Sequence, residues 1–251
     1  MFFFDDFYGK KVLKSTLLYS CDHFFTTRDI ILHCGTRNDL QNSASDGVAF
    51  LLKKFNFQNE NLYIVKQTHS ANVVIADKNN HVYEETDGII LTEPDMITFL
   101  NFADCVPIIL HDDKLNIGGV VHAGWRGTAS KIVQNAVEKM ISLGSNPVDI
   151  SAAIGPAIGK CCFCVNDDVF YKITYGIENN LIKQISSYDE QTDKYFVDLK
   201  IVNKILLEQS SVKKIDVGDY CTSCMNDVFF SYRNENGNTA RHSAVLKLRN
   251  K

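Results

Sequence analysis

Residues 118–128, GGVVHAGWRGT, constrain the fold more than any other segment of the chain. An apolar run over residues 117–121 has the length of a buried strand, His122 follows at a glycine-containing turn, and a helical pattern begins directly afterwards. Such strand, turn and helix junctions occur in α/β proteins, where a rigid strand end and the free N–H groups of a helix N-terminus favour binding sites. We therefore expect His122 to hold a metal or assist a nucleophile, and Arg126 to bind an anion.

Length and composition predict a single mixed α/β domain over residues 1–251. The chain is 45% hydrophobic and 22% charged, as in ordinary globular proteins. Its 26 Lys and Arg residues against 30 Asp and Glu residues give a net charge of -4, so nucleic acid is not an expected partner. Its apolar runs have strand length, well below the ~20 residues of a membrane span.

The N-terminal segment, MFFFDDFYGKK, lacks the positive n-region, long apolar stretch and cleavage site of a signal peptide. We expect a cytoplasmic location. The eight cysteines are then expected to be thiols or metal ligands, not a disulfide framework.

Hydrophobic periodicity and turn residues predict the order of elements. Helices are expected to end near Phe55, with Ser43 or Ser45 as the N-cap, and to span residues 128–143, 167–175 and 198–209. Strands are expected over residues 12–19, 23–27, 62–65, 72–76, 89–91, 96–100, 117–121, 148–154 and 215–220. A surface loop is expected over 186–194, and a strand, turn and strand over 227–248. Pro107 lacks the N–H that a central strand needs, so the next strand is expected to begin after it.

Three residues at predicted turns form a candidate metal site: His69 in QTHSA, Cys105 in ADCVP and His122 in VHAGW. Two imidazoles and a thiolate suit Zn²⁺, and three protein ligands leave a fourth position open for water or substrate. The alternative is that both histidines are hydrogen-bonded loop residues and Cys105 a small buried one.

The same residues support a second mechanism without a metal. Cys105 would be the nucleophile and one histidine its base, as in a Cys-His hydrolase. Asp104 or Gln67 would then orient the imidazole.

A separate group of cysteines comprises Cys161, Cys162, Cys164, Cys221 and Cys224. Cys221 and Cys224 have the spacing of half a zinc knuckle or of a redox pair. A structural metal is one interpretation. Apolar neighbours such as Phe163 and Phe229 favour the other, free thiols in the core.

Among the arginines, Arg126 has the clearest role, because a glycine-flanked turn after Trp125 is a poor place for a merely solvated charge. Arg28 lies near a predicted strand end and is a further substrate-binding candidate, although a salt bridge is the default there, as for Arg233 and Arg241. The chain lacks the G-x-G-x-x-G, Walker and G-x-S-x-G motifs, the zinc deaminase signature and any His-x-His pair.

Several motifs in order resemble the laccase-domain family, which was first described as polyphenol oxidases and is now regarded as an unusual type of purine nucleoside phosphorylase. The motifs are QTHSANVV, ETDGIIL, FADCVPIIL, GGVVHAGWRGT, AIGPAIGKCC and CTSC followed by FFSYR. They extend over nearly the whole chain. Ala240 departs from the family pattern, which usually has glycine there, and Asn101 replaces a different small residue.

The resemblance implies a layered α-β-β-α domain similar to the cysteine-hydrolase fold. It implies zinc bound by His69, Cys105 and His122, and phosphorolysis of adenosine, inosine and S-methyl-5'-thioadenosine to the free base and the ribose 1-phosphate, with adenosine deamination alongside. Cys105, His122 and Arg126 are then the expected catalytic residues. Arg28, Gln67, Asp104 and Arg126 are expected to bind the substrate.

Three alternatives remain open from the sequence. The same ligands could hold copper in a phenol oxidase, although no methionine is evidently placed as an axial ligand. A Cys-His hydrolase would act on an amide or a cell-wall precursor. A zinc-stabilised partner-binding domain would have no activity.

Overall fold

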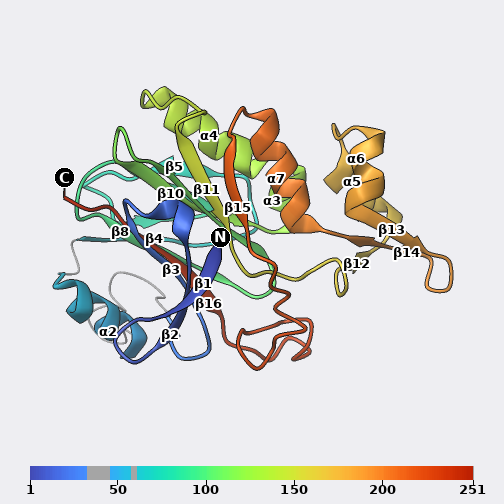
Figure 1. The fold of residues 1–251 in the computed structure, drawn as a ribbon, viewed down its shortest axis with the longest axis horizontal. Coiled ribbons are helices and arrows are strands. Elements are labelled where there is room, and N and C mark those ends of the chain that lie inside the picture. Colours follow the sequence, from blue (N-terminus) through green and yellow to red (C-terminus); the bar gives the residue numbers. More distant parts are fainter. Residues whose placement is uncertain (33–45, 58–60, 251) are drawn as a thin grey trace.

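The computed structural model describes residues 1–32, 46–57 and 61–250. Its strands form a seven-stranded, a six-stranded and a three-stranded sheet, and helices lie outside the two large sheets (Figure 1). This confirms the predicted mixed α/β class. The likeness to the cysteine-hydrolase fold and the single domain stay predictions.

The seven-stranded sheet contains strands from both ends of the described chain. In spatial order its strands are β1 (Phe2–Asp6), β2 (Lys11–Ser15), β3 (Asp22–Thr26), β16 (His242–Lys247), β8 (Ile97–Phe102), β4 (Leu62–Val65) and β6 (Val82–Tyr83). β16 is therefore a central strand, paired antiparallel with both β3 and β8.

The six-stranded sheet contains the first half of the GGVVHAGWRGT segment. Its order is β15 (Lys214–Val217), β11 (Ile150–Ile154), β9 (Val106–Asp112), β10 (Ile117–Ala123), β7 (Gly88–Leu91) and β5 (Val73–Ile75). Both neighbours of β10 are antiparallel to it, so the end of β10 lies beside the start of β9 and of β7.

Strand periodicity explains how the two large sheets pack. Successive side chains point to opposite faces, so Val120 of β10 enters the core between the sheets while Val121 faces the helices on the other side. In β16, Ala244 and Leu246 likewise enter the inter-sheet core, and Val245 points to the opposite face.

Helices cover the outer faces of both sheets. α4 (Ile132–Ser142) and α7 (Leu199–Gln209) pack on the six-stranded sheet through buried side chains such as Val133 and Leu206. α2 (Asp46–Phe55) packs on the seven-stranded sheet through Leu51. The remaining elements are the 3-10 helix η1 (Thr16–Leu18), α3 (Trp125–Ala129), α5 (Asp167–Thr174), α6 (Asn179–Ile185) and the three-stranded sheet of β12 (Cys164–Val165), β14 (Lys194–Val197) and β13 (Ser186–Asp189).

Two predictions around the central segment are corrected by the structure. The helix expected over 128–143 is broken into α3 and α4, because Lys131 has φ 64 and a left-handed residue cannot continue a right-handed helix. The strand expected to begin after Pro107 includes it. The Pro107 carbonyl accepts from Gly155 N, so its missing N–H would face the position where β11 has already ended at Ile154.

Other corrections lie away from this segment. The predicted surface loop over 186–194 is a hairpin of β13 and β14, and α6 precedes it. The first strand expected after residue 227 is absent from the described residues, which form turns there. The predicted strand over 12–19 ends at Ser15, where η1 begins, and β1 was not predicted. Ser43 and Ser45 lie outside the described residues.

Across the described ranges, the longest helices are too short or too polar to traverse a lipid bilayer.

Candidate active site

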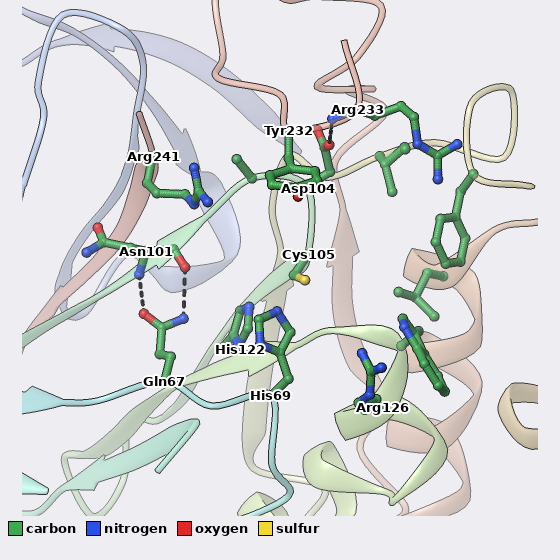
Figure 2. Close-up of a pocket in the computed structure, with 15 residues that line it drawn as sticks. Gln67, His69, Asn101, Asp104, Cys105, His122, Arg126, Tyr232, Arg233 and Arg241 are labelled. Carbon is green, nitrogen blue, oxygen red and sulfur yellow. Dashed lines mark hydrogen bonds between the residues drawn. The ribbon is translucent and has the colours of Figure 1, made fainter. Parts of the chain in front are cut away.

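The structure brings His69, Cys105 and His122 together. His122 is near the end of β10, Cys105 is on the link from β8 to β9, and His69 is on the connection from β4 to β5. One ligand atom from each lies within 4.8 Å of the others. Their side chains converge at the wall of a pocket (Figure 2). The pairing of β10 with β7 and β9 therefore brings together residues that are far apart in the sequence.

Asp87, at the start of β7, orients His122. Its carboxylate is fully buried and lies 2.7 Å from His122 Nδ1. A carboxylate can only accept, so Nδ1 carries the proton and the Nε2 lone pair is available to a metal. The carbonyl of Asp87 also accepts the backbone N–H of His122 at 2.7 Å.

The same carboxylate fixes the loop that carries His69. It accepts backbone N–H groups from Thr68, His69 and Ser70 at 3.1, 3.0 and 2.7 Å. The Ser70 hydroxyl adds a further bond at 2.7 Å. These bonds stabilise His69 in a left-handed backbone conformation, φ 62, which costs free energy in a non-glycine residue.

Gly124 allows Cys105 and His69 to approach the turn. A Cβ added at Gly124 would lie 3.0 Å from Cys105 Sγ and 3.0 Å from His69 Cδ2. Both contacts are closer than ordinary van der Waals distances, so a side chain here would push the two ligands aside. The glycine of the turn is thus needed for close approach.

Cys105 and His122 strongly influence each other's ionisation. Burial opposes ionisation of the Cys105 thiol, but His122 and His69 outweigh it and lower the pKa of Cys105 to about 6. Burial also opposes protonation of His122, but Cys105 and Asp87 outweigh it and raise the pKa of His122 to about 9. Without a metal, the pair at neutral pH is a thiolate and an imidazolium.

The donor set fits a metal ion of intermediate softness. Zn²⁺ takes imidazole nitrogens at ~2.0–2.1 Å and thiolate sulfur at ~2.3 Å, which requires ligand atoms as close as these. The hydrogen bond from His122 Nδ1 to Asp87 is the carboxylate–histidine arrangement typical of metal sites. The set also suits copper, so the donors alone do not identify the metal.

The pocket beside this cluster has a volume of about 580 Å³. Arg126, Arg233 and Arg241 line it, together with the aromatic rings of Trp125, Phe163 and Tyr232. The guanidinium of Arg126 stacks 4.3 Å from the Trp125 ring and has no hydrogen-bond or ion-pair partner among the residues that the structure describes. Its charge is therefore available to an anionic ligand.

Gln67 and Asp104 line the pocket as expected, but their polar groups also hold its walls. Gln67 exchanges two hydrogen bonds of 2.8 Å with the backbone of Asn101 (Figure 2). The Asp104 carboxylate accepts from the Thr222 hydroxyl and, at 2.8 Å, from Arg233 N. Their expected contact with a substrate stays a prediction.

Arg28 does not line this pocket. Its guanidinium pairs with Glu235, donates to the Asn226 carbonyl at 2.6 Å and stacks on Phe230. The structure thus places it in the salt bridge that was the default expectation, and its part in substrate binding stays a prediction.

Sequence reasoning missed several residues of the site. Asp87 was not selected as a site residue, and a salt bridge was the default expectation for Arg233 and Arg241. The signal lay in the motifs themselves, because ETDGIIL contains Asp87 and FFSYR contains Tyr232 and Arg233. Their proximity depends on strand order, which no local pattern in the sequence reveals.

Fold and site together define a class: a mixed α/β protein with a centre of two histidines and one cysteine in an arginine-lined pocket. The family model described as multi-copper polyphenol oxidoreductase laccase matches residues 25–249. The chain belongs to this family, and the resemblance stated from the motifs is confirmed.

Several curated relatives of the chain carry the names of enzymes. A purine nucleoside phosphorylase of Staphylococcus saprophyticus is 33% identical over 83% of this chain and 81% of that protein. An adenosine deaminase from an unknown prokaryotic organism is 31% identical over 72% and 73%. The alignment with the purine nucleoside phosphorylase YlmD of Bacillus subtilis, also 33% identical, spans 65% of this chain and only 59% of that protein.

The crystal structure of YlmD from Geobacillus stearothermophilus has the same fold. It superposes with a TM-score of 0.85 at 27% identity and covers 98% of this chain and 99% of that one.

Proposed function

We propose that this protein is a zinc-dependent purine nucleoside phosphorylase with adenosine deaminase side activity. The observation that carries the proposal is one pocket that combines the His69, Cys105 and His122 donors with the unpaired guanidinium of Arg126. Phosphorolysis needs a site that holds the phosphate anion beside the nucleoside, and a bound metal ion would add a polarising centre there. The names of the relatives support the same activity.

The substrate classes proposed are adenosine, inosine and S-methyl-5'-thioadenosine, with inorganic phosphate as co-substrate. A pocket of about 580 Å³ is large enough for a nucleoside. Trp125, Phe163 and Tyr232 supply aromatic surface on which a purine can stack. We assign the phosphate to the side of the pocket where Arg126 lies.

The reaction exchanges one bond for another at the ribose. A phosphate oxygen forms a bond to C1′ while the bond from C1′ to the purine nitrogen breaks, and its electron pair leaves with the purine, which takes up a proton. Arg126 would hold the phosphate in line with C1′ and partly neutralise its charge. The phosphate is an anion and the nucleoside is neutral. The arginine-lined wall would compensate the phosphate charge and so lower the free energy needed to bring phosphate next to the nucleoside.

Zinc, when bound by His69, Cys105 and His122, would supply a Lewis acid that polarises an oxygen of the reacting groups. Asp87 keeps His122 in the tautomer that leaves Nε2 free, and it holds the His69 loop in place. Asp104 and Gln67, which also line the pocket, are proposed to position the substrate. Adenosine deamination is proposed as a side activity of the same pocket because one relative is named an adenosine deaminase.

Incubation of the purified protein with adenosine, with and without phosphate, tests the proposal. Adenine and ribose 1-phosphate are expected only with phosphate, and inosine is expected from deamination. If neither adenine nor inosine forms with zinc-loaded protein, the proposal is wrong.

A second candidate function rests on the Cys105 thiolate and the His122 imidazolium, with Asp87 behind the histidine. This order of groups is also that of a Cys-His hydrolase. Assays of fully metal-free protein distinguish the hydrolase from the zinc-dependent phosphorylase. Amidase activity that survives chelation but is lost in Cys105→Ser would support the hydrolase, and activity restored only by zinc would support the phosphorylase.

The description of the family model favours testing copper as well. Elemental analysis after purification without added metals distinguishes the ions, and oxygen uptake on phenols by a copper-loaded protein would support an oxidase.

A further inference from the structure

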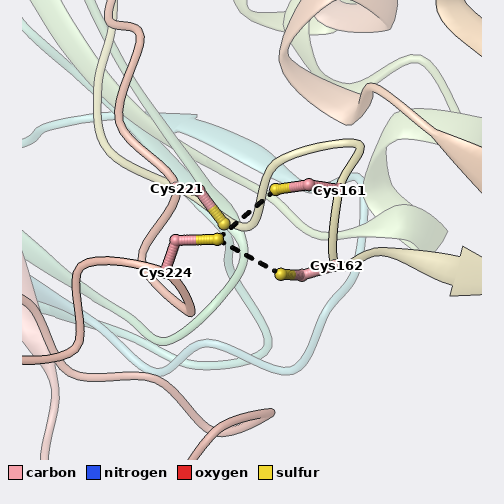
Figure 3. Close-up of side chains that lie close together, drawn as sticks. All are labelled: Cys161, Cys162, Cys221 and Cys224. Atoms are coloured by element: carbon pink, nitrogen blue, oxygen red, sulfur yellow. Dashed lines mark hydrogen bonds between the residues drawn. The ribbon is translucent and has the colours of Figure 1, made fainter.

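Cys161, Cys162, Cys221 and Cys224 lie in a second cluster of metal-type ligands. Their four sulfur atoms are all within 4.8 Å of one another. Two come from the loop after β11 and two from the loop after β15, and their side chains point toward a common centre (Figure 3). No disulfide joins these cysteines, but the expectation that they lie in the core is wrong, because Cys161 and Cys224 are exposed at the surface and Cys162 and Cys221 are only partly buried.

The spacing of the sulfurs fits a tetrahedral ion. Zn²⁺ bound to four thiolates at ~2.3 Å places the sulfurs about 3.8 Å apart. Cys224 Sγ lies 3.6 Å from Cys161 Sγ and 3.5 Å from Cys162 Sγ. A disulfide pairs two sulfurs and leaves the others out, whereas Cys224 is nearly equidistant from two partners.

The backbone around the cluster is arranged for close approach. Gly159 N donates to Cys221 Sγ at 3.2 Å, a contact that stabilises a thiolate. A Cβ added at Gly159 would lie 3.1 Å from Cys221 Cβ and 3.3 Å from Cys161 Sγ. A bridge between Ala157 and Cys221 keeps the two loops in register.

We propose that these four cysteines bind a structural Zn²⁺, separate from the ion of the proposed active site. Four thiolates complete a closed tetrahedral shell, so this ion has no position for a substrate. Arg233, whose Nη1 donates to the Cys162 carbonyl at 2.7 Å, supplies positive charge near the resulting dianionic centre.

The ion would connect two loops that line the pocket of the candidate active site. Ile158 and Phe163, on either side of Cys161 and Cys162, line this pocket. Next to Cys221, the Thr222 hydroxyl donates to Asp104. Arg233 contacts both Asp104, through its N–H, and the loop of Cys162. Zinc here would therefore stabilise one wall of the pocket without touching the substrate.

Metal analysis of the intact protein tests the proposal independently of activity. Protein purified with a reductant is expected to hold about two zinc ions per chain, since the two sites use different ligands. Cys221→Ser/Cys224→Ser and His69→Ala/His122→Ala are each expected to lose about one ion. Cys164→Ser is the matched control, because Cys164 begins β12 two residues after Cys162 and lies outside the four-sulfur group, and it should keep both ions.

A second measurement uses the unmodified protein and so does not depend on a variant that folds. Cys161 and Cys224 are exposed, so they should react readily with iodoacetamide unless a metal holds them. Protection that a strong chelator removes supports the site.

Three results would overturn the proposal. One is rapid alkylation of Cys161 and Cys224 in untreated protein. Another is protection that only a reductant removes, which shows disulfides. The third is equal zinc content in the unmodified protein and in folded Cys221→Ser/Cys224→Ser. A loss of nucleoside phosphorylase activity with zinc content unchanged would instead bear on the proposed function.

Discussion

Asp87 joins the segments that carry two of the three candidate ligands, because one buried carboxylate contacts His122, the His69 backbone and Ser70. Metal ligands whose carboxylate partner is removed typically lose about 10–100-fold in metal affinity. We expect Asp87→Asn to weaken zinc binding by roughly that factor, since an amide holds the Nδ1 proton of His122 less strongly. Competition with a zinc-binding dye measures the affinity.

Asp112→Asn is the matched control, because Asp112 is equally buried but caps a turn at the far end of β9. An affinity for zinc that is the same in Asp87→Asn and in the control would contradict the role given to Asp87.

Gly124 has a steric role that a single methyl group tests. Gly124→Ala places a Cβ 3.0 Å from both Cys105 Sγ and His69 Cδ2, so it is expected to lower the zinc content of the purified protein. Gly144→Ala is the comparison, since it strains a backbone at φ 99 far from the ligands and should reduce thermal stability without loss of zinc. Full zinc content in Gly124→Ala would show that the turn accommodates the methyl group.

Arg126 is the proposed phosphate contact. A hydrogen bond to a charged group contributes about 1.5–3 kcal/mol, so Arg126→Ala should raise the KM for phosphate by roughly tenfold or more, with a smaller effect on the KM for adenosine. Arg249→Ala, which removes an arginine paired with Asp22 on the surface, should leave both constants unchanged. Steady-state kinetics at varied phosphate decide, and an unaltered phosphate KM in Arg126→Ala would exclude this role.

At the scale of elements, the N-cap of α7 is a residue whose contribution to the free energy of unfolding can be measured. Asp198 caps the helix, and its side chain accepts the N–H groups of Lys200 and Ile201. Replacing such a cap by alanine costs about 1 kcal/mol, which lowers the Tm of a domain of this size by roughly 2–4 °C.

The comparison is Asn166→Ala at the start of α5. Asn166 occupies the N-cap position but makes no side-chain capping bond, so its replacement should change the Tm little. Thermal unfolding followed by circular dichroism measures both variants. Equal shifts in the two would mean that the Asp198 bonds add no stability.

Elements with strong local signals were predicted well. The period of apolar residues located α7, and the apolar runs over residues 62–65 and 117–121 located β4 and most of β10. Predictions of helices and strands failed where tertiary contacts, not local sequence, determine the backbone conformation. β13, which reads SSYD, is mostly polar and gives no strand signal of its own, and the left-handed Lys131 that separates α3 from α4 has no residue-type signal.

The candidate site divides in the same way. His69, Cys105 and His122 could be selected because each stands at a turn after an apolar run, and the structure brings all three together. Arg233, Arg241 and Tyr232 could not be placed, since they reach the pocket only through the packing of a long irregular segment against the sheets.

At the scale of the whole molecule, buried histidines make stability depend on pH. Burial lowers the pKa of both His23 and His242 to about 4. Above about pH 6.5 both states of the chain hold these groups neutral, and below it the unfolded chain takes up protons first. Stability should therefore fall as the pH drops from about 6.5 toward 4, by about 1.4 kcal/mol per pH unit for each histidine.

Urea unfolding at about pH 7.5 and about pH 5 measures this slope. In His23→Gln the amide oxygen can still accept the Ser15 N–H that His23 Nε2 accepts at 3.0 Å, so the variant should fold and lose part of the slope. A pH slope as steep in His23→Gln as in the unmodified protein would assign the effect to other groups.

The central place of β16 in the seven-stranded sheet has a consequence for synthesis in the cell. β16 lies between β3 and β8 and pairs with both. Each of these strands therefore has one open edge until residues 242–247 have been synthesised and have paired. Open edges invite pairing with other chains, and a nascent polypeptide exposes the edge of β3 from early in synthesis and the edge of β8 once residue 102 has been added. Chaperone dependence should thus be greatest for ribosome-bound or truncated chains that lack this last strand, and production of the protein should tolerate C-terminal truncation far less well than changes at most loops.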